Sequence, residues 1–412
     1  MIKFRKKENR FMDMGKLCVA VCVWLGFAVP ISAQTTTSDS VGVDIKHTSK
    51  GFQFTTPDNK FQLQIAGRLQ FRYAFSSDQD PLTFDDYSAP NQHVFKINRA
   101  RLKVGGHAYQ PWLKYYFEYE LGASRLLDFR VMVEKWPWLS FKVGQWKMEY
   151  TRERSISSGK QQMLERSLIN RPFTIDRQQG ASIYGRIDEG GLVDFNYHLA
   201  ALTGMGRGAR ENDDKKLMYV GKVFWNFLGD GPSISGTDLS YHEKPQASIA
   251  LAGATNTSPY TRFSSSGGGE LLGYEGGEPG QYNVDQWVLE TALKYKAFSW
   301  QSEYHRKRIN DRLSEDTGHL AGFYLQGGYV VNNGAVGTRK PLLEVAGRYA
   351  YYQPELSLPD NSEEEYTLAV NCFFNGHLNK LTADVTLFDF DDMSLNLEAN
   401  DWRVRVQYDF SF

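Results

Sequence analysis

Hydrophobic and polar side chains alternate along much of the chain, beginning with residues 61–75. In that segment the odd positions are apolar or glycine, and the even positions are Gln, Arg or Ala. Because successive side chains of a strand point to opposite faces, the pattern predicts a strand with one oily and one polar face. Its length exceeds the mean globular strand of about 5–6 residues. It is sufficient to cross a bilayer at a tilt, which takes about 9–11 residues.

The same alternation returns up to the C-terminus. Strong segments are 113–121, 193–201, 217–225, 287–295, 343–351, 366–374, 381–387 and 402–412, and weaker ones are 97–107, 127–136, 139–150, 180–187, 246–254, 297–305 and 320–331. With 61–75 they predict sixteen strands, many with aromatic residues near their ends, which is typical of outer-membrane barrels. The predicted fold class is all-β, a transmembrane antiparallel β-barrel. A soluble β-sandwich would show the same alternation, but its strands are shorter.

The N-terminus has the features of a secretory signal peptide. Residues 1–33 carry six basic and two acidic side chains, then the apolar run 17–29 and the small-residue end 31–33. We expect cleavage between Ala33 and Gln34. The alternative is an anchor helix, but the apolar run is shorter than the roughly 20 residues that a spanning helix needs. Export and a barrel together predict the outer membrane of a Gram-negative bacterium.

The rest of the chain divides into a short polar segment and the barrel. Residues 34–59 are rich in Thr and Ser and show no clear period, so we predict a periplasmic N-terminal segment there. Residues 60–412 form the predicted barrel. The long gaps 227–245 and 255–284 are expected to be loops, and the glycine-rich second one is expected to be external and flexible.

Charge and cysteine content exclude several classes of protein. The 47 basic and 48 acidic residues give a net charge of −1, which excludes a polybasic nucleic-acid-binding protein. Without residues 1–33 the chain holds 41 basic and 46 acidic residues, a net charge of −5. Cys372 is then the one cysteine left, and the eight histidines show no metal-binding spacing. No metal, cofactor or nucleic-acid partner is therefore expected.

Residues 151–178 differ from the other connections between predicted strands. Ser158 followed by Gln161 matches a capping box, which predicts a short helix beginning there. A helical connection of this length could fold into the lumen, and we predict such an inward-folded constriction loop. An outward-facing loop with a helical turn is the alternative.

Three stretches carry a resemblance to a known family. They are Ile97-Asn98-Arg99-Ala100-Arg101-Leu102, Val143-Gly144-Gln145-Trp146-Lys147, and Arg152-Glu153-Arg154 through Glu165-Arg166-Ser167-Leu168-Ile169-Asn170. Together they resemble the phosphate-selective porin O and P family. The resemblance implies a sixteen-stranded barrel, usually a homotrimer, that passes small anions such as phosphate by diffusion. It also implies a ladder of lumen arginines and lysines, some of them on the inward loop.

Strand parity supplies candidates for this ladder, because arginine stays charged and binds phosphate oxygens through a planar fork. Rings of Arg or Lys select anions in pores. The candidate pore-lining and anion-binding residues are Arg68, Arg72, Arg99, Arg101, Lys103, Arg130, Lys142, Arg348, Arg403 and Arg405 on polar strand faces, with Arg152 and Arg154 at the base of the loop. The same faces hold acidic residues, namely Glu118, Glu120, Glu134, Glu290, Glu344 and Asp384. The cations could therefore pair with acids and support the wall, so anion preference stays open.

The predicted function is passive diffusion of small hydrophilic solutes through an outer-membrane porin, with anion or phosphate preference as a hypothesis. The alternatives are a non-conducting structural or adhesin barrel, and an outer-membrane hydrolase whose Ser–His pair would meet across strands. The terminal Phe412 resembles the assembly signal of outer-membrane barrels. It predicts the barrel-assembly machinery as a partner, beside outer-membrane lipid and further copies of the chain.

Overall fold

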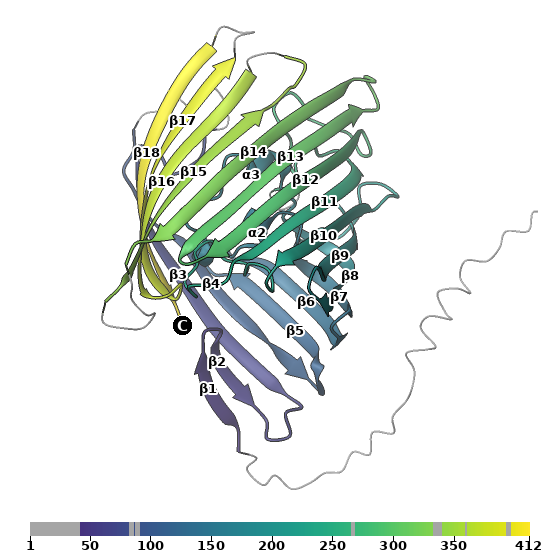
Figure 1. Cartoon of the computed structure of the whole chain (residues 1–412). Coiled ribbons are helices and arrows are strands. Elements are labelled where there is room, and N and C mark those ends of the chain that lie inside the picture. The colour runs from purple at the N-terminus through teal and green to yellow at the C-terminus, as the bar shows by residue number, and fades with distance from the viewer. Residues whose placement is uncertain are drawn as a thin grey trace, which may run out of the picture. The chain divides into compact units, whose positions relative to one another are not determined.

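Sixteen antiparallel strands close into a barrel in the computed structural model (Figure 1). The structure describes residues 42–81, 86, 91–264, 268–332, 340–358, 361–392 and 397–412, and residues 43–412 form one compact unit. The predicted signal peptide and its cleavage site lie outside the described residues. No helix in the described part of the chain has the length and apolar character that spanning a membrane requires.

Each barrel strand pairs with its neighbours in the chain, and the last strand pairs with the first. The strands are β3 (Gln62–Phe75), β4 (Val94–Ala108), β5 (Gln110–Glu120), β6 (Arg125–Trp136), β7 (Leu139–Lys147), β8 (Arg177–Gly190), β9 (Val193–Leu202), β10 (Met218–Leu228), β11 (Gln246–Ser258), β12 (Tyr282–Tyr295), β13 (Phe298–Asp311), β14 (Thr317–Val330), β15 (Leu342–Gln353), β16 (Asn361–Asn375), β17 (Asn379–Asp392) and β18 (Leu397–Ser411). Every predicted strand overlaps one of them, so the predicted barrel of sixteen strands is confirmed.

Two further strands precede the barrel. β1 (Asp44–Thr48) and β2 (Gly51–Thr55) form a hairpin, and β2 pairs with the first residues of β3, with Phe52 opposite Ile65. They lie within segment 34–59, where the sequence predicted no strand. Each has only five residues, which is too short for an alternating pattern to stand out.

The two ends of the barrel differ in their connections. Turns such as 137–138, 191–192 and 296–297 lie at one end, whereas connections 148–176 and 259–281 lie at the other. Outer-membrane barrels have short periplasmic turns and longer external loops. The first end is therefore periplasmic, and β18 finishes there.

The strand faces follow the predicted alternation. On β18 the side chains of Trp402, Tyr408 and Phe410 are exposed on the outer surface, whereas Arg403 and Arg405 are buried on the inner side. An outer apolar surface can face lipid, and a polar inner surface can line an aqueous lumen.

The closing seam between β3 and β18 depends on a glycine. The backbone amide of Gly67 donates to the carbonyl of Phe412 (2.9 Å), and the Phe412 amide donates back (3.1 Å). The Phe412 ring lies over Gly67, so closely that a Cβ there would come within 2.3 Å of the ring. A residue with a side chain at position 67 would therefore displace the C-terminal ring.

Three connections fold into the lumen instead of leaving it open. The first, the constriction loop 148–176, contains α2 (Arg152–Ser155), a 3₁₀ turn (Ser158–Lys160) and α3 (Asn170–Phe173). Its inward course confirms the predicted constriction loop. The second is 259–281, and the third is the periplasmic connection 229–245, where Gly236 donates to the Lys160 carbonyl (2.9 Å).

The short helix predicted at Ser158 is present only as a 3₁₀ turn, and its predicted capping box does not form. The helical turn begins earlier, because Thr151 caps α2 by accepting a hydrogen bond from the Arg154 amide (3.1 Å). Ser158 begins only a 3₁₀ turn, and Gln161 donates to the Glu153 carbonyl (2.8 Å). Contacts inside the loop therefore replace the capping box.

The expected flexible external loop 255–284 also differs from the structure. Phe263 and Leu271 are buried in an apolar cluster with Phe173 and Ile175 of the constriction loop. The Asp176 amide donates to the Phe263 carbonyl (2.8 Å). These apolar side chains within a glycine-rich stretch dock the segment against the constriction loop inside the barrel.

Candidate pore and constriction loop

The backbone of the constriction loop bonds mainly to one side of the barrel, which we call the tethering wall and define as β12–β18. Side chains of the loop also bond to Arg68, Arg72 and Arg99 of β3 and β4. Three buried carboxylates of this wall accept backbone N–H groups of the loop. Glu303 accepts from Glu153 (2.7 Å), Asp384 from Leu164 (3.1 Å) and Glu365 from Leu168 (2.8 Å). A charged acceptor roughly doubles the strength of a hydrogen bond, so the three acids fix the course of the loop.

Amide and ammonium groups of the same wall satisfy the loop carbonyls. Lys380 donates to the Gln161 carbonyl (2.8 Å), Asn371 to that of Gln162 (2.9 Å), and Gln286 to that of Phe173 (2.8 Å). An irregular buried segment needs partners of this kind, because an unpaired buried polar group is costly. The tethering wall thus supplies both acceptors and donors to the loop backbone.

Three predicted ladder residues belong to this attachment. Arg348 donates to Glu365 (2.7 Å) and to the carbonyl of Glu165 (3.0 Å). Arg405 forms a two-point pair with Asp384 (2.9 and 2.7 Å). Arg403 lies 2.6 Å from Asp80 and stacks on the ring of Phe388 at 4.7 Å. All three side chains point inward, as parity predicted, but the loops leave them no exposed surface.

Four more of the predicted cations are covered. Arg152 donates to the carbonyl of Ser233 (2.7 Å) in the periplasmic connection. Arg72 pairs with Asp78 (3.0 Å) and Glu165 (2.7 Å). Arg68 donates to Ser157 (2.8 Å) and Lys142 to Glu149 (2.7 Å). The side chains of Arg152, Arg72 and Lys142 are at most 4% exposed, and Arg68 is buried as well.

The remaining candidates lie on the opposite side, which we call the facing wall and define as β3–β8, or on the loop opposite it. Arg101 donates to Glu118 (3.0 Å) and Glu120 (2.7 Å). Arg130 donates to Asp128 (3.3 Å). Lys103 makes no hydrogen bond or ion pair with any residue that the structure describes. These side chains are only partly buried.

In several of these pairs the cation is more exposed than its acid. The exposed fraction of the side chain is 15% for Arg101 against 8% for Glu118, and 23% for Arg130 against 5% for Asp128. On the loop, Arg154 at 15% pairs with Asp176 at 10%. In each of these pairs, the cation is therefore more exposed to the lumen than the acid is. Glu149, Glu165 and Asp80 are among the exceptions, with 27%, 24% and 34% of their side chains exposed.

A cavity of about 300 Å³ lies between the constriction loop and the external part of β3 and β4. Its lining includes six basic residues and three acidic ones, namely Arg72, Lys96, Arg99, Arg154, Arg166 and Arg171 with Asp78, Asp80 and Glu165. Arg99 holds both oxygens of Glu165 (3.0 Å each). Burial alone would raise the pKa of Glu165, but Arg99 and Arg72 hold it well below its usual range. The cavity therefore keeps an excess of positive charge.

Three of these six basic residues were not among the candidates predicted from the sequence. Lys96 lies just before the predicted strand 97–107, and Arg166 and Arg171 lie on the loop, where parity gives no direction. The quoted stretch Glu165-Arg166-Ser167 already contained one of them. Strand parity predicts that Arg99 and Arg101 point into the lumen, but it does not predict which cations the constriction loop covers.

A closed barrel with an apolar outer surface, a charged lumen and an inward loop defines an outer-membrane porin. The sequence profile of the phosphate-selective porin O and P family matches residues 68–410, so the chain belongs to that family.

Among curated proteins the chain is similar to Porin O of Pseudomonas aeruginosa, with 24% identity over 339 residues, covering 76% of this chain and 74% of that protein. Among solved structures it is similar to the anion-selective porin from Comamonas acidovorans (TM-score 0.58, 13% identity, 85% and 99% of the two chains). It is also similar to the outer membrane channel DcaP of Acinetobacter baumannii (TM-score 0.52, 9% identity, 87% and 99%). These structural likenesses support the fold.

Proposed function

We propose that this porin passes small anions, phosphate among them, by passive diffusion along the facing wall. The observation that carries the proposal is the exposure of Arg101, Arg130 and Arg154 beyond that of their acidic partners. Lys103, which makes no ion pair or hydrogen bond with a described residue, adds to the same surface. Fixed cations at a narrow water-filled passage raise the local concentration of anions.

The cavity at the external mouth supports phosphate as one of the solutes. Among its six basic side chains, Arg171 has a guanidinium group without a hydrogen bond to a described residue, which can offer a planar fork to phosphate. The guanidinium groups of Arg99, Arg154 and Arg166 already bond to protein acceptors and add positive charge beside it. The names of two similar proteins, Porin O and an anion-selective porin, agree with this proposal.

We also propose how the protein is exported, assembled and organised. Residues 1–33 direct export and are removed after Ala33, and the C-terminal Phe412 is recognised during barrel assembly in a Gram-negative envelope. Three copies form the working unit. The protein acts as a channel without metal, cofactor or catalysis.

The charge proposal is tested by single-channel recording in a planar bilayer under a KCl gradient. The variant Arg101→Gln with Lys103→Gln is compared with Lys296→Gln, which removes an exposed cation from a periplasmic turn. A unit charge about 10 Å from the ion path contributes about 0.4 kcal/mol in water, or about a twofold change in local ion concentration. Removing two such cations should lower the local anion concentration about fourfold and raise the local cation concentration about fourfold, so the anion/cation permeability ratio should fall about 16-fold in the double variant and stay constant in the control. An unchanged ratio in the double variant contradicts the proposal.

Phosphate is tested by titrating it into the chloride current. Arg171 lines the mouth cavity and faces the charges of Glu363 and Asp80 without a hydrogen bond to any described residue. Arg171→Gln should weaken block by phosphate about twofold to fivefold while the barrel stays folded. A current that phosphate does not block in the wild-type protein removes phosphate from the proposal. A folded barrel without conductance would favour the structural or enzymatic alternatives.

A further inference from the structure

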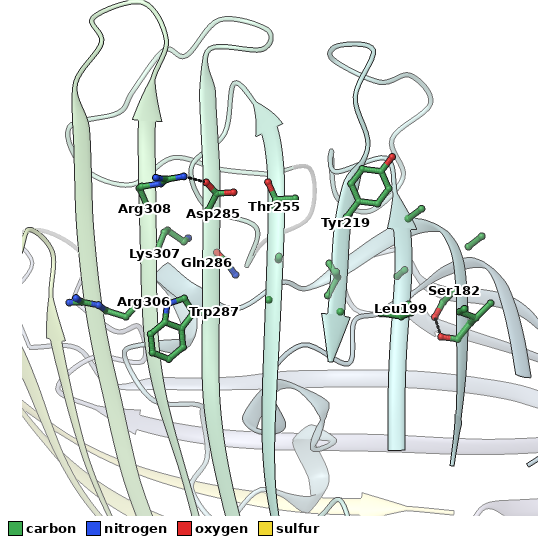
Figure 2. Close-up of a pocket in the computed structure, with 18 of the residues that line it drawn as sticks. Ser182, Leu199, Tyr219, Thr255, Asp285, Gln286, Trp287, Arg306, Lys307 and Arg308 are labelled. Carbon is green, nitrogen blue, oxygen red and sulfur yellow. Dashed lines mark hydrogen bonds and ion pairs between the residues drawn. The ribbon is translucent and has the colours of Figure 1, made fainter. Parts of the chain in front are cut away.

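A groove of about 950 Å³ crosses the outer face of the barrel, among residues of β7 to β14 (Figure 2). Gly221 of β10 and Gly253 of β11 face each other at its centre. Leu199, Tyr219 and Trp287 stand around them, and these three side chains are exposed on the outer surface. The groove is thus an apolar depression in the part of the wall that faces lipid.

A second cavity of about 700 Å³ adjoins this groove and shares Tyr219, Thr255, Asp285 and Arg308 with it. Its other lining is polar and includes Lys215, Lys216, Asn283 and Asn310. The two lysines directly precede β10, and Asn310 lies near the end of β13, so the polar cavity is at the external end. Together the two cavities are apolar toward the middle of the membrane and polar toward the outer surface.

Three basic side chains in the linings of the two cavities make no ion pair within the described part of the chain, although Asp213 and Asp214 directly precede Lys215. Arg306 and Lys215 are exposed and make no hydrogen bond or ion pair with residues in the described ranges. Lys216 reaches only the hydroxyl of Thr257 (3.3 Å). Arg308 pairs with Asp285 (2.6 Å), the dashed contact in Figure 2, and this pair uses the one carboxylate that lines either cavity. The two linings therefore hold three cations, Arg306, Lys215 and Lys216, that make no ion pair with a described residue.

We propose that this groove binds a phosphate-bearing, multiply acylated lipid of the outer leaflet. An acyl chain lies over Gly221 and Gly253, one phosphate group contacts Arg306, and a second phosphate group nearer the outer surface contacts Lys216. Basic pockets at membrane interfaces bind anionic headgroups, and charges on the lipid-facing surface are tolerated near the interface rather than at the midplane.

A second copy of the chain is the competing occupant of this face. It would have to bury Arg306, Lys215 and Lys216 without supplied carboxylates. The centres of protein interfaces are depleted of charged residues, and unpaired buried charges are costly. An anionic lipid compensates the same charges directly, so the observations favour the lipid.

The first test is native mass spectrometry of the detergent-solubilised full-length barrel with added lipid A as the probe. Phosphatidylcholine serves as the uncharged comparison. Each cation near an anionic headgroup contributes about fivefold in affinity. The variant Arg306→Gln with Lys216→Gln should therefore bind lipid A about 25-fold more weakly, and Lys296→Gln should bind it as the wild-type protein does.

The second test fills the groove. Gly253 has ordinary extended geometry, and a Cβ there would meet only the carbonyl of Gln286, at 3.9 Å. Gly253→Leu should lower lipid A binding about tenfold, because it occupies the place of an acyl chain. Gly347→Leu is the matched control, because Gly347 is on β15 and its nearest neighbour, Leu368, would be 3.6 Å from the new Cβ.

Heat-modifiable migration and conductance confirm that each variant is folded. Three results would overturn the proposal: no preference of the wild-type protein for lipid A, equal binding by wild type and both groove variants, or loss of the oligomer in Gly253→Leu with lipid binding unchanged. The last result would assign this face to contact between copies.

Discussion

The tethering wall and the facing wall carry the same residue types, but these residues have different roles on the two walls. On the tethering wall, Arg348 and Arg405 are covered by the loop and held by Glu365 and Asp384. On the facing wall, Arg101 keeps 15% of its side chain exposed beside its acids. An inward-facing arginine therefore shows little about selectivity until its exposure is known. The covered pairs position the loop, and the partly exposed ones face the solute.

Among the substitutions that test the difference between the two walls, replacement of Asp384 should have the largest effect. Asp384→Ala leaves Arg405 without its carboxylate and the Leu164 amide without its acceptor. Removing one partner of a buried ion pair costs about 3–5 kcal/mol. We expect a lower free energy of unfolding in denaturant titration and a larger, noisier single-channel conductance as the loop detaches. Asp389→Asn, an exposed site on the same strand, should change neither, and an unchanged Asp384→Ala channel would contradict the tethering role.

Glu153 makes the attachment of the constriction loop sensitive to pH. Burial raises the pKa of this loop carboxyl to about 7, although Arg348 lowers it and Glu303 raises it further. Because the pKa of Glu153 is higher in the folded protein than in the unfolded chain, protonation of Glu153 stabilises the folded protein. This stabilisation is complete below about pH 4.5 and is lost as the pH rises through about 7. The span corresponds to about 3 kcal/mol.

The measurement is the pH dependence of unfolding for wild type and Glu153→Gln. The wild-type free energy of unfolding should fall relative to the variant between about pH 4.5 and 7. Parallel curves for the two proteins across this range would refute the assignment.

The contact between Gly67 and Phe412 at the seam of β3 and β18 provides a comparison, because neither residue bonds to a described residue of the constriction loop. Gly67→Val should push the Phe412 ring away, and overpacking of this kind costs about 1–3 kcal/mol. We expect the temperature at which the barrel unfolds in SDS gels to fall, with ion selectivity unchanged. Gly347→Val, which adds the same side chain at an open position, serves as control. A seam variant as heat-resistant as the control would show that the ring is dispensable.

The sequence predicted the strands well because a membrane barrel demands long segments of period two, as in residues 61–75 and 402–412. Parity also placed Arg348, Arg403 and Arg405 on the inner side. It could not show that they are covered, because their covering depends on where the constriction loop lies. The pairing of Arg405 with Asp384 depends on the register of β17 and β18.

The loops were harder to predict for the same physical reason. Ser158 and Gln161 fit a capping box locally, but Gln161 bonds to other loop carbonyls instead. Phe263 and Leu271 dock a glycine-rich segment that reads as mobile from composition alone. Both outcomes follow from contacts between segments far apart in the chain.

The most direct test of the two-wall account compares two charge-removing double variants in one bilayer measurement of reversal potential. Arg405→Gln with Asp384→Asn removes a covered pair while keeping an amide acceptor for the Leu164 N–H. Arg101→Gln with Lys103→Gln removes two partly exposed cations. We expect an unchanged anion/cation permeability ratio for the first variant and about a 16-fold lower ratio for the second. Equal shifts in both, or a shift in the first alone, would contradict it.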